Sequence, residues 1–150
     1  MKKWWVLLFV FMVGSSSANA DLATWLDYFL PPATTASRPA SDHAITRAYQ
    51  QQLRDIQVQG QGKVTRILAD DKKGIRHQRF LINLANGHSL LIVHNIDLAP
   101  RINNLRAGDS VAFFGEYVWN KKGGLVHWTH HDPRGRHMGG WLEHQGQRYQ

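Results

Sequence analysis

The feature that most constrains the fold is a change of hydrophobic period near residue 57. Beyond this point, apolar residues alternate with polar ones in short segments, which is the period of half-buried β-strands. The expected strands cover residues 58–68, 77–84, 88–96, 110–119 and 125–129. Turn-forming sequences separate them: DDKKG at 70–74, Asn86-Gly87, and NKKGG at 120–124. This part of the chain is therefore expected to be mainly β.

The order of the elements predicts a barrel. Between the third and fourth strands, residues 97–109 contain Pro100 and are long enough for a turn or two of helix. Three strands, a short helical connection and two further strands are the order of a five-stranded Greek-key barrel of the OB type. Gly60 and Gly62 in the first strand suit the bulge or tight bend that such a barrel needs. We expect a small five-stranded OB-like barrel, with a small open β-roll as the alternative.

A helix is expected ahead of the barrel. Ser41 is a candidate N-cap, and Ile45, Ala48 or Tyr49, Leu53 and Ile56 follow at spacings that place them on one side of a helix. Residues 41–150 are therefore predicted to form one domain. Before it, residues 21–40 comprise a short amphipathic segment and a linker rich in Pro, Ser and Thr.

The first twenty residues have the three zones of a signal peptide. Lys2 and Lys3 are followed by an apolar run over residues 4–13 and by the small-x-small sequence Ala18-Asn19-Ala20. The apolar run is too short to cross a bilayer core of about 30 Å as a helix. We expect cleavage after Ala20, export to the periplasm or the exterior, and no transmembrane segment in the mature protein.

Charge and cysteine content narrow the function classes. Of the 18 Lys and Arg residues, two lie in the predicted signal peptide, so the mature chain carries 16 basic against 11 acidic residues. This balance favours acidic partners such as nucleic acid or an acidic polysaccharide. The chain has no cysteine. Disulfides, thiol catalysis, lipid attachment to cysteine and iron–sulfur ligation by cysteine are therefore excluded.

Several motifs together resemble a known family. They are HQRFLINL at 77–84, HNIDLAPRI at 94–102, GEYVWN at 115–120, GGLVHWTHHDP at 123–133 and GGWLEHQGQRY at 139–149. In this order they are similar to a family of small exported bacterial proteins classed as a domain of unknown function, over about residues 57–150. The resemblance implies an exported single domain with a C-terminus that contains His and Trp. It implies no activity.

A binding function draws on basic and aromatic residues. OB barrels often hold oligonucleotides or oligosaccharides, with aromatic rings stacked on the ligand and cations at its phosphates. Phe113, Tyr117 and Trp119 share one strand face, which is more typical of a core, but Trp119 lies next to the 120–124 turn. The candidate ligand-binding residues are Arg76, Arg79, Trp119, Lys121, Lys122, Trp128 and Trp141.

The histidines near the C-terminus raise the question of a metal ion. A divalent metal is the one cofactor considered, with His127, His130, His131 and His137 as its candidate ligands. They converge only if the chain turns sharply at the His-Asp-Pro sequence ending at Pro133. No HExxH sequence is present, so the general base of a zinc peptidase is missing.

Three functions follow from these residues. The first is an exported, non-enzymatic OB-like binding module for an acidic or ring-bearing polymer, with no catalytic residues assigned. The second is a metal-dependent hydrolase that resembles a nuclease and uses the histidine cluster. The third is an interaction subunit that docks a partner through the N-terminal helix. Trp141 and Leu142 of the tail are expected to pack over the barrel mouth, and the alternative is a ligand-contacting rim formed by residues 127–137 and Trp141.

Overall fold

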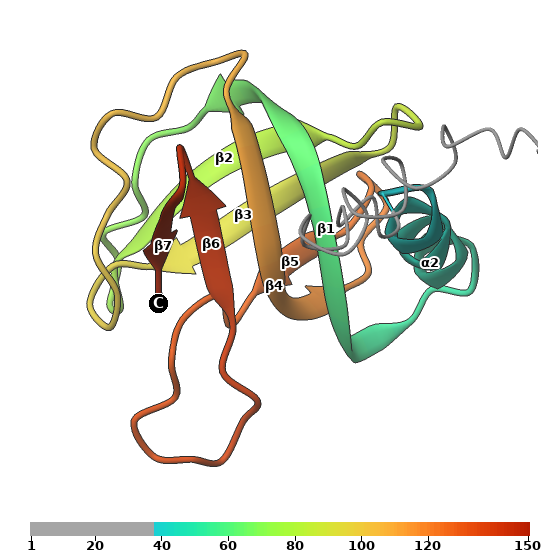
Figure 1. The fold of residues 1–150 in the computed structure, drawn as a ribbon. Coiled ribbons are helices and arrows are strands. Elements are labelled where there is room, and N and C mark those ends of the chain that lie inside the picture. Colours follow the sequence, from blue (N-terminus) through green and yellow to red (C-terminus); the bar gives the residue numbers. More distant parts are fainter. Residues whose placement is uncertain (1–37) are drawn as a thin grey trace, which may run out of the picture. The chain divides into compact units, whose positions relative to one another are not determined.

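The computed structural model describes residues 38–150, which fold into a barrel with one helix beside it (Figure 1). The predicted signal peptide and amphipathic segment lie outside the described residues. The elements run in the order α2 (Arg38–Gln50), β1 (Arg54–Ile67), β2 (His77–Asn83), β3 (Ser89–Asn95), β4 (Ser110–Val118), β5 (Leu125–His127), β6 (Trp141–His144) and β7 (Gln147–Tyr149).

The predicted mainly-β, OB-like barrel is confirmed. The strands are hydrogen-bonded in the order β1-β2-β3-β5-β4, and β1 also pairs with β4, which closes the ring. All pairs in the ring are antiparallel except β3–β5, which is parallel. This is a Greek-key connection, because the chain crosses from β3 to β4 before β5 returns between them.

The long strand β1 closes the barrel by changing partners. It pairs with β4 as far as Lys63, and from Lys63 onward it pairs with β2. The irregular positions in its register lie between Arg54 and Ile56 and between Val64 and Arg66, not at the glycines. Gly60 instead allows close packing, since a Cβ there would lie 2.7 Å from Cζ of Phe113.

Along each barrel strand, every second side chain faces inward, and these inward side chains form the core. Phe80, Ile82, Leu90 and Ile92 come from the β2–β3 hairpin and are fully buried. They meet further buried side chains from β1, β4, β5 and β6, which are Val58, Val64, Val111, Phe113, Tyr117, Val126 and Leu142. The predicted face of the fourth strand is thus inward at Val111, Phe113 and Tyr117, whereas Trp119 is only half-buried against this core.

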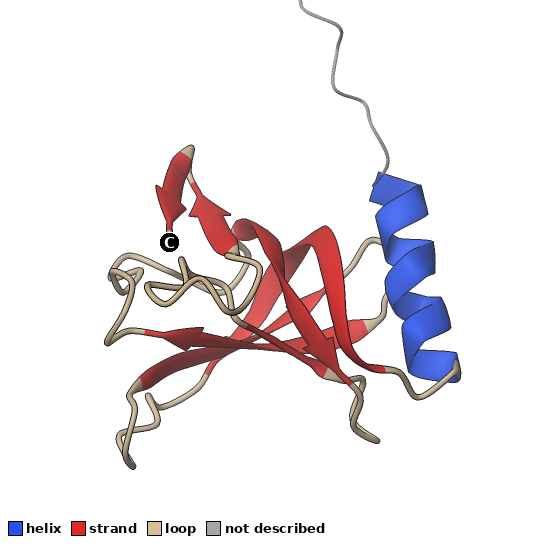
Figure 2. Cartoon of the chain, turned by 90° about the horizontal axis from the view of Figure 1, so that it is seen from below, coloured by secondary structure: helices blue, strands red, loops and turns tan. Residues whose placement is uncertain are grey.

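The helix α2 lies beside the barrel (Figure 2), and its Ile45 and Ala48 are buried in the core. It begins at Arg38, three residues before the predicted N-cap. It ends at Gln50, so Leu53 and Ile56 contact the core from outside the helix. Within residues 38–150, no helix is both long and apolar enough to cross a bilayer.

Residues 96–109 form turns, not the predicted turn or two of helix. Ile102 and Leu105 from this segment are buried in the core. The side-chain amide of Gln78 donates to the Ile102 carbonyl at 2.9 Å and accepts from the Ile102 N–H at 2.9 Å. The segment is therefore held by a side chain from β2, which replaces the backbone bonds of a helix.

The C-terminal tail forms a β-hairpin that was not predicted. Strand β6 pairs with β4 over Val111–Phe114, and β7 then pairs with β6 (Figure 1). The predicted packing of the tail is partly met, since Leu142 is fully buried in the core and Trp141 is half-buried. The predicted fifth strand is shorter than expected and ends at His127, because Trp128 has a left-handed backbone with φ of 51°.

Candidate functional site

A groove lies on the outer side of β2 and β3, between the residue that follows β1 and the turn between β4 and β5. Its volume is about 370 Å³, and its floor is formed by Leu68, Leu81 and Leu91. Leu81 and Leu91 face each other across the β2–β3 pair and are half-buried. The rim is formed by Asn120, Lys121 and Lys122. The groove therefore combines an aliphatic floor with two exposed cations at one edge.

The turn that carries the two lysines is ordered by local hydrogen bonds. The side-chain oxygen of Asn120 accepts from the Lys122 N–H at 2.8 Å and from the Gly124 N–H at 3.3 Å. Gly124 has φ of 96° and lies against the Tyr117 ring, where a side chain has no room. The Tyr117 hydroxyl donates to the Gly123 carbonyl at 3.3 Å, and burial raises the pKa of Tyr117 to about 12. The lysines thus stand on a turn anchored to the core.

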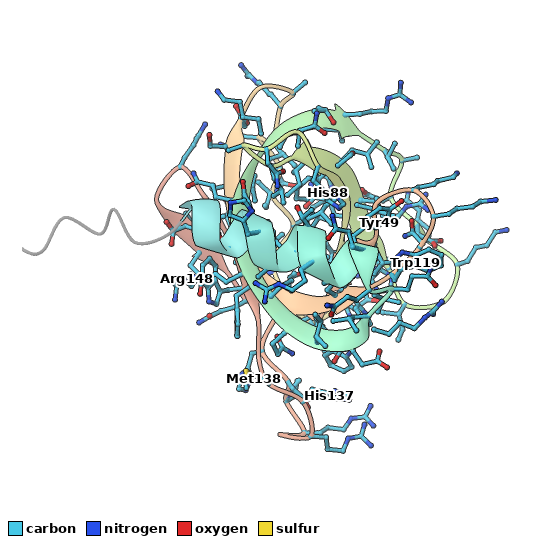
Figure 3. All side chains as sticks on the ribbon, turned by 90° about the vertical axis from the view of Figure 1, so that its right-hand side faces the viewer. Tyr49, His88, Trp119, His137, Met138 and Arg148 are labelled. Atoms are coloured by element: carbon cyan, nitrogen blue, oxygen red, sulfur yellow. The ribbon has the colours of Figure 1, made fainter. Side chains whose placement is uncertain are left out.

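Trp119 belongs to a separate aromatic cluster. Its ring stacks on Tyr49 of α2 at 6.4 Å between centroids, and Tyr49 meets the edge of His88 at 5.0 Å. Figure 3 shows these three side chains at the C-terminal end of the helix. His88 also binds the Gly123 carbonyl through Nε2 at 2.8 Å. Trp119 is absent from the lining of the groove and supports the turn from the helix side.

Arg76 and Arg79 lie in the loop region before and within β2 and have partners inside the chain. Arg76 forms an ion pair with Asp97 at 2.6 Å, and its backbone and side-chain hydrogen bonds hold the pKa of Asp97 below its usual range. Arg79 donates to the Ala69 carbonyl through Nε at 3.2 Å and through Nη2 at 2.9 Å. Both arginines therefore connect loops, and their role in binding stays a prediction.

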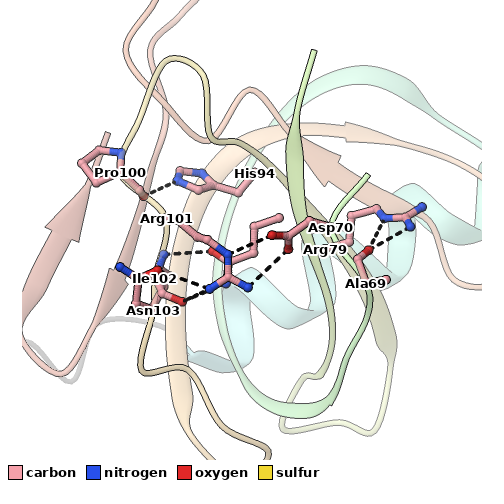
Figure 4. Close-up of polar contacts among 9 residues, drawn as sticks. Ala69, Asp70, Arg79, His94, Pro100, Arg101, Ile102 and Asn103 are labelled. Atoms are coloured by element: carbon pink, nitrogen blue, oxygen red, sulfur yellow. Dashed lines mark hydrogen bonds and ion pairs between the residues drawn. The ribbon is translucent and has the colours of Figure 1, made fainter. Parts of the chain in front are cut away.

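A polar network lies at the end of the barrel where Arg76 pairs with Asp97 (Figure 4). Arg101 donates to both carboxylate oxygens of Asp70, at 3.0 and 3.3 Å. His94 is fully buried between Thr129 and Pro100, with Nδ1 2.9 Å from the Thr129 hydroxyl and Nε2 3.2 Å from the Pro100 carbonyl. Because a carbonyl only accepts, Nε2 carries the proton and Nδ1 accepts from Thr129. Burial lowers the pKa of His94 to about 4, so its ring is neutral at pH 7.

The predicted metal ligands are distributed around Trp128. Ring centroids of His127, His130 and His137 lie 6.3, 5.2 and 4.0 Å from that of Trp128. His127 Nε2 is 3.1 Å from a carboxylate oxygen of Glu116, and His130 Nδ1 is 2.7 Å from the His131 carbonyl. In the part of the chain that the structure describes, no three His, Cys, Asp or Glu residues are grouped as metal ligands. The divalent metal site stays a prediction.

The loop at residues 131–139 is organised by Asp132. Its carboxylate accepts the backbone N–H groups of Arg134, Arg136 and His137 at 3.0, 2.7 and 2.8 Å. These bonds lower the pKa of Asp132 to about 2. The His130 carbonyl accepts from the Gly140 N–H at 2.9 Å and closes the base of the loop. The chain thus turns at the His-Asp-Pro sequence, as the sequence suggested, but the histidine rings do not converge.

The two C-terminal tryptophans are already stacked on cationic or aromatic neighbours. The Trp128 ring is nearly parallel to His137, at 20°. Trp141 lies beside Phe114 at 6.3 Å, and the guanidinium of Arg148 lies 4.3 Å from its centroid. Both rings are half-buried and lie away from the groove, whose lining does not include them. Of the seven predicted ligand-binding residues, the groove brings together Lys121 and Lys122.

The leucine floor was missed in the sequence, although a signal for it exists. Leu81 and Leu91 occupy the outward positions of two strands whose inward positions are also apolar. A strand with apolar residues on both faces is typical of one whose outer face is covered or binds something.

Comparison with known proteins gives a family and no activity. The family model described as "Protein of unknown function (DUF3465)" matches residues 29–150. No curated protein matches the chain.

Proposed function

The chain belongs to the DUF3465 family of proteins of unknown function, and we propose that it is a non-enzymatic binding module for an acidic, ring-bearing polymer, either nucleic acid or an acidic glycan. The observation that carries the proposal is the groove on the outer side of β2 and β3, with its leucine floor and two lysines on one rim. This is the side and the turn that OB barrels use for oligonucleotides and oligosaccharides. The sequence of residues 1–20 supports export as the setting.

The groove suits such a polymer in size and chemistry. A volume of about 370 Å³ lies in the range of ligand pockets and suits one ring with its linkage. Leu81 and Leu91 offer apolar contact to the ring face, while the ammonium groups of Lys121 and Lys122 attract phosphate or carboxylate. Because lysine ammonium groups are point charges, they attract an acidic backbone without reading sequence.

Binding of a fluorescent single-stranded oligonucleotide and of alginate, a polyuronate, tests the proposal. We expect affinity to fall as salt rises, because neutralised backbone charges release counterions. The double change Lys121→Gln/Lys122→Gln should lower affinity about tenfold and flatten the salt dependence by about 0.7 in slope for each lost contact with a single strand. The variant Leu91→Ser should weaken binding without changing the slope.

The matched control is Lys72→Gln/Lys73→Gln, which removes the same charge from the exposed turn before β2. Equal losses in both pairs would mean that only net charge matters and would overturn the assignment to the groove. Low salt favours contacts with a charged backbone, so binding should be tightest at about 0.05 M salt. Absence of binding to both polymers under this condition would overturn the proposed function. Cleavage of the oligonucleotide during the assay would support the hydrolase alternative.

A further inference from the structure

Three loops meet at one end of the barrel. The loop 68–76 leads into β2 at His77, which pairs with Asn95 at the end of β3, where the segment 96–109 begins. Strand β5 runs parallel to β3, so the loop 128–140 that follows β5 leaves from the same end. The bond between His94 and Thr129 confirms that the second and third of these loops are neighbours. The turn with Lys121 and Lys122 precedes β5 and so lies at its opposite end.

Three of the four exposed large apolar side chains of the described residues come from these loops, and the fourth, Ile67, lies in β1 opposite Phe80 of β2. Ile75 is 59% exposed, Leu98 is 47% exposed and Met138 is 60% exposed, and each comes from a different one of the three loops. Ile67, at 40%, is the last residue of β1 before the first loop. Ile75 and Leu98 flank the Arg76–Asp97 ion pair, so they are close to one another. Figure 3 shows Met138 on the loop that projects below the barrel.

The same loops present four cations without an ion-pair partner in the described part of the chain. Lys72, Lys73, Arg134 and Arg136 are exposed, and their side chains form no hydrogen bond or ion pair within residues 38–150. The acidic residues of the loops each have a partner within the chain, as Asp109 has in His144. Asp70 binds Arg101, Asp97 binds Arg76, and Asp132 accepts three backbone N–H groups. Asp71 accepts the Lys73 N–H at 3.0 Å.

We propose that these three loops dock the protein on a bilayer surface that contains anionic phospholipid, with Ile75, Leu98 and Met138 entering the headgroup boundary. Aliphatic side chains gain free energy when they leave water for hydrocarbon, and neighbouring Lys and Arg residues are attracted to anionic headgroups. A polymer of bases or sugars fits this end less well, since it would be recognised by exposed ring faces, and the Trp128 ring at the start of the loop 128–140 is stacked on His137.

Flotation with lipid vesicles tests the proposal. Residues 37–150 form one compact unit with a complete core, so this fragment serves as the protein and excludes the apolar N-terminal run. We expect it to float with vesicles of equal parts phosphatidylglycerol and phosphatidylcholine, and not with phosphatidylcholine alone. The triple change Ile75→Ser/Leu98→Ser/Met138→Ser should lower the partition coefficient about tenfold or more, because three apolar side chains no longer leave water.

Two further variants make the test specific to these loops. Lys72→Gln/Lys73→Gln/Arg134→Gln/Arg136→Gln should abolish the preference for anionic vesicles, since each cation near the surface adds to the attraction. Lys121→Gln/Lys122→Gln, at the other end of β5, should keep vesicle binding. Thermal unfolding confirms that each variant is folded.

Three results would overturn the docking proposal. The first is an apolar triple variant that binds vesicles as tightly as the unchanged fragment. The second is no flotation of the unchanged fragment with anionic vesicles. The third is loss of oligonucleotide binding in the apolar triple variant, which would assign the loops to the polymer. These results do not decide the proposed polymer function, which is tested with other ligands and with variants of the groove lysines.

Discussion

At the scale of single residues, His94 shows how a side chain that suggests chemistry can serve the fold. Its ring is fully buried, its two nitrogens both have partners, and burial lowers its pKa to about 4. The neighbouring imidazoles of His130 and His77 lower it further, while the hydrogen bonds to Pro100 and Thr129 raise it. A histidine that is neutral throughout the physiological range joins β3 to two loops without adding charge to the core.

This pKa makes the stability of the protein depend on pH. The folded-state pKa lies below the ordinary 6.5, so the unfolded chain takes up a proton at His94 first as pH falls. The stability that the neutral His94 contributes to the folded state is complete above about pH 6.5, and it is lost as pH falls toward 4. Between pH 7 and pH 5 we expect the free energy of unfolding to decrease by roughly 2 kcal/mol, measured by urea unfolding at both values.

The variant His94→Gln separates this effect from other titrations. Glutamine can donate to the Pro100 carbonyl and accept from Thr129, but it does not titrate, so most of the change between pH 7 and pH 5 should disappear. His43→Gln, at an exposed position of α2, is the matched control and should keep the full change. If His94→Gln shows the same pH dependence as the control, another group is responsible.

At the scale of elements, the loop 131–139 takes its shape from one carboxylate. Asp132→Asn should loosen it, because an amide has one acceptor oxygen where the carboxylate uses two, and its NH₂ group would face a backbone donor. We expect hydrogen exchange at the amides of residues 134, 136 and 137 to become at least about tenfold faster, since their bonds open more often. Exchange at Phe113 in the core should not change.

Asp71→Asn is the control for this loop. Asp71 accepts a single N–H, from Lys73, through one oxygen, and the oxygen of an asparagine amide can keep that bond. Exchange at Lys73 should therefore change little. Unchanged protection of the three amides in Asp132→Asn would show that the loop is held by other contacts, such as the stack of His137 on Trp128.

The elements also show what local sequence can and cannot predict. Alternation and turn residues located the five barrel strands, and Gly87 has the left-handed φ of 84° that its hairpin turn requires. The β6–β7 hairpin was missed because its strands are four and three residues long, too short for a period to be recognised. The early end of β5 depends on the backbone of Trp128, a residue type that rarely adopts positive φ.

The site was harder to predict than the strands. Residue types indicate which chemistry a side chain can perform, but they do not indicate which distant residue becomes its partner in the fold. The partner of Arg76 is Asp97, 21 residues away, and that of Arg101 is Asp70, 31 residues away. At these separations, neither pair forms a local sequence pattern from which the contact could be predicted. Lys121 and Lys122 were easier to place, because a Gly-containing turn between two strands is exposed in nearly any barrel.

At the scale of the whole molecule, Lys121 and Lys122 precede β5 and the loop 128–140 follows it, although Leu68 at the start of the loop 68–76 also lines the groove. Effects of changes at sites that share no partners usually add to within about 0.5 kcal/mol, which is a factor of about two in affinity. Combining Lys121→Gln/Lys122→Gln with Ile75→Ser/Leu98→Ser/Met138→Ser should therefore lower oligonucleotide affinity no further than the lysine pair does alone. Vesicle partition should likewise match that of the apolar variant. Both are measured on one set of four proteins, and a larger mutual effect would show that the groove and the loops form a single continuous surface.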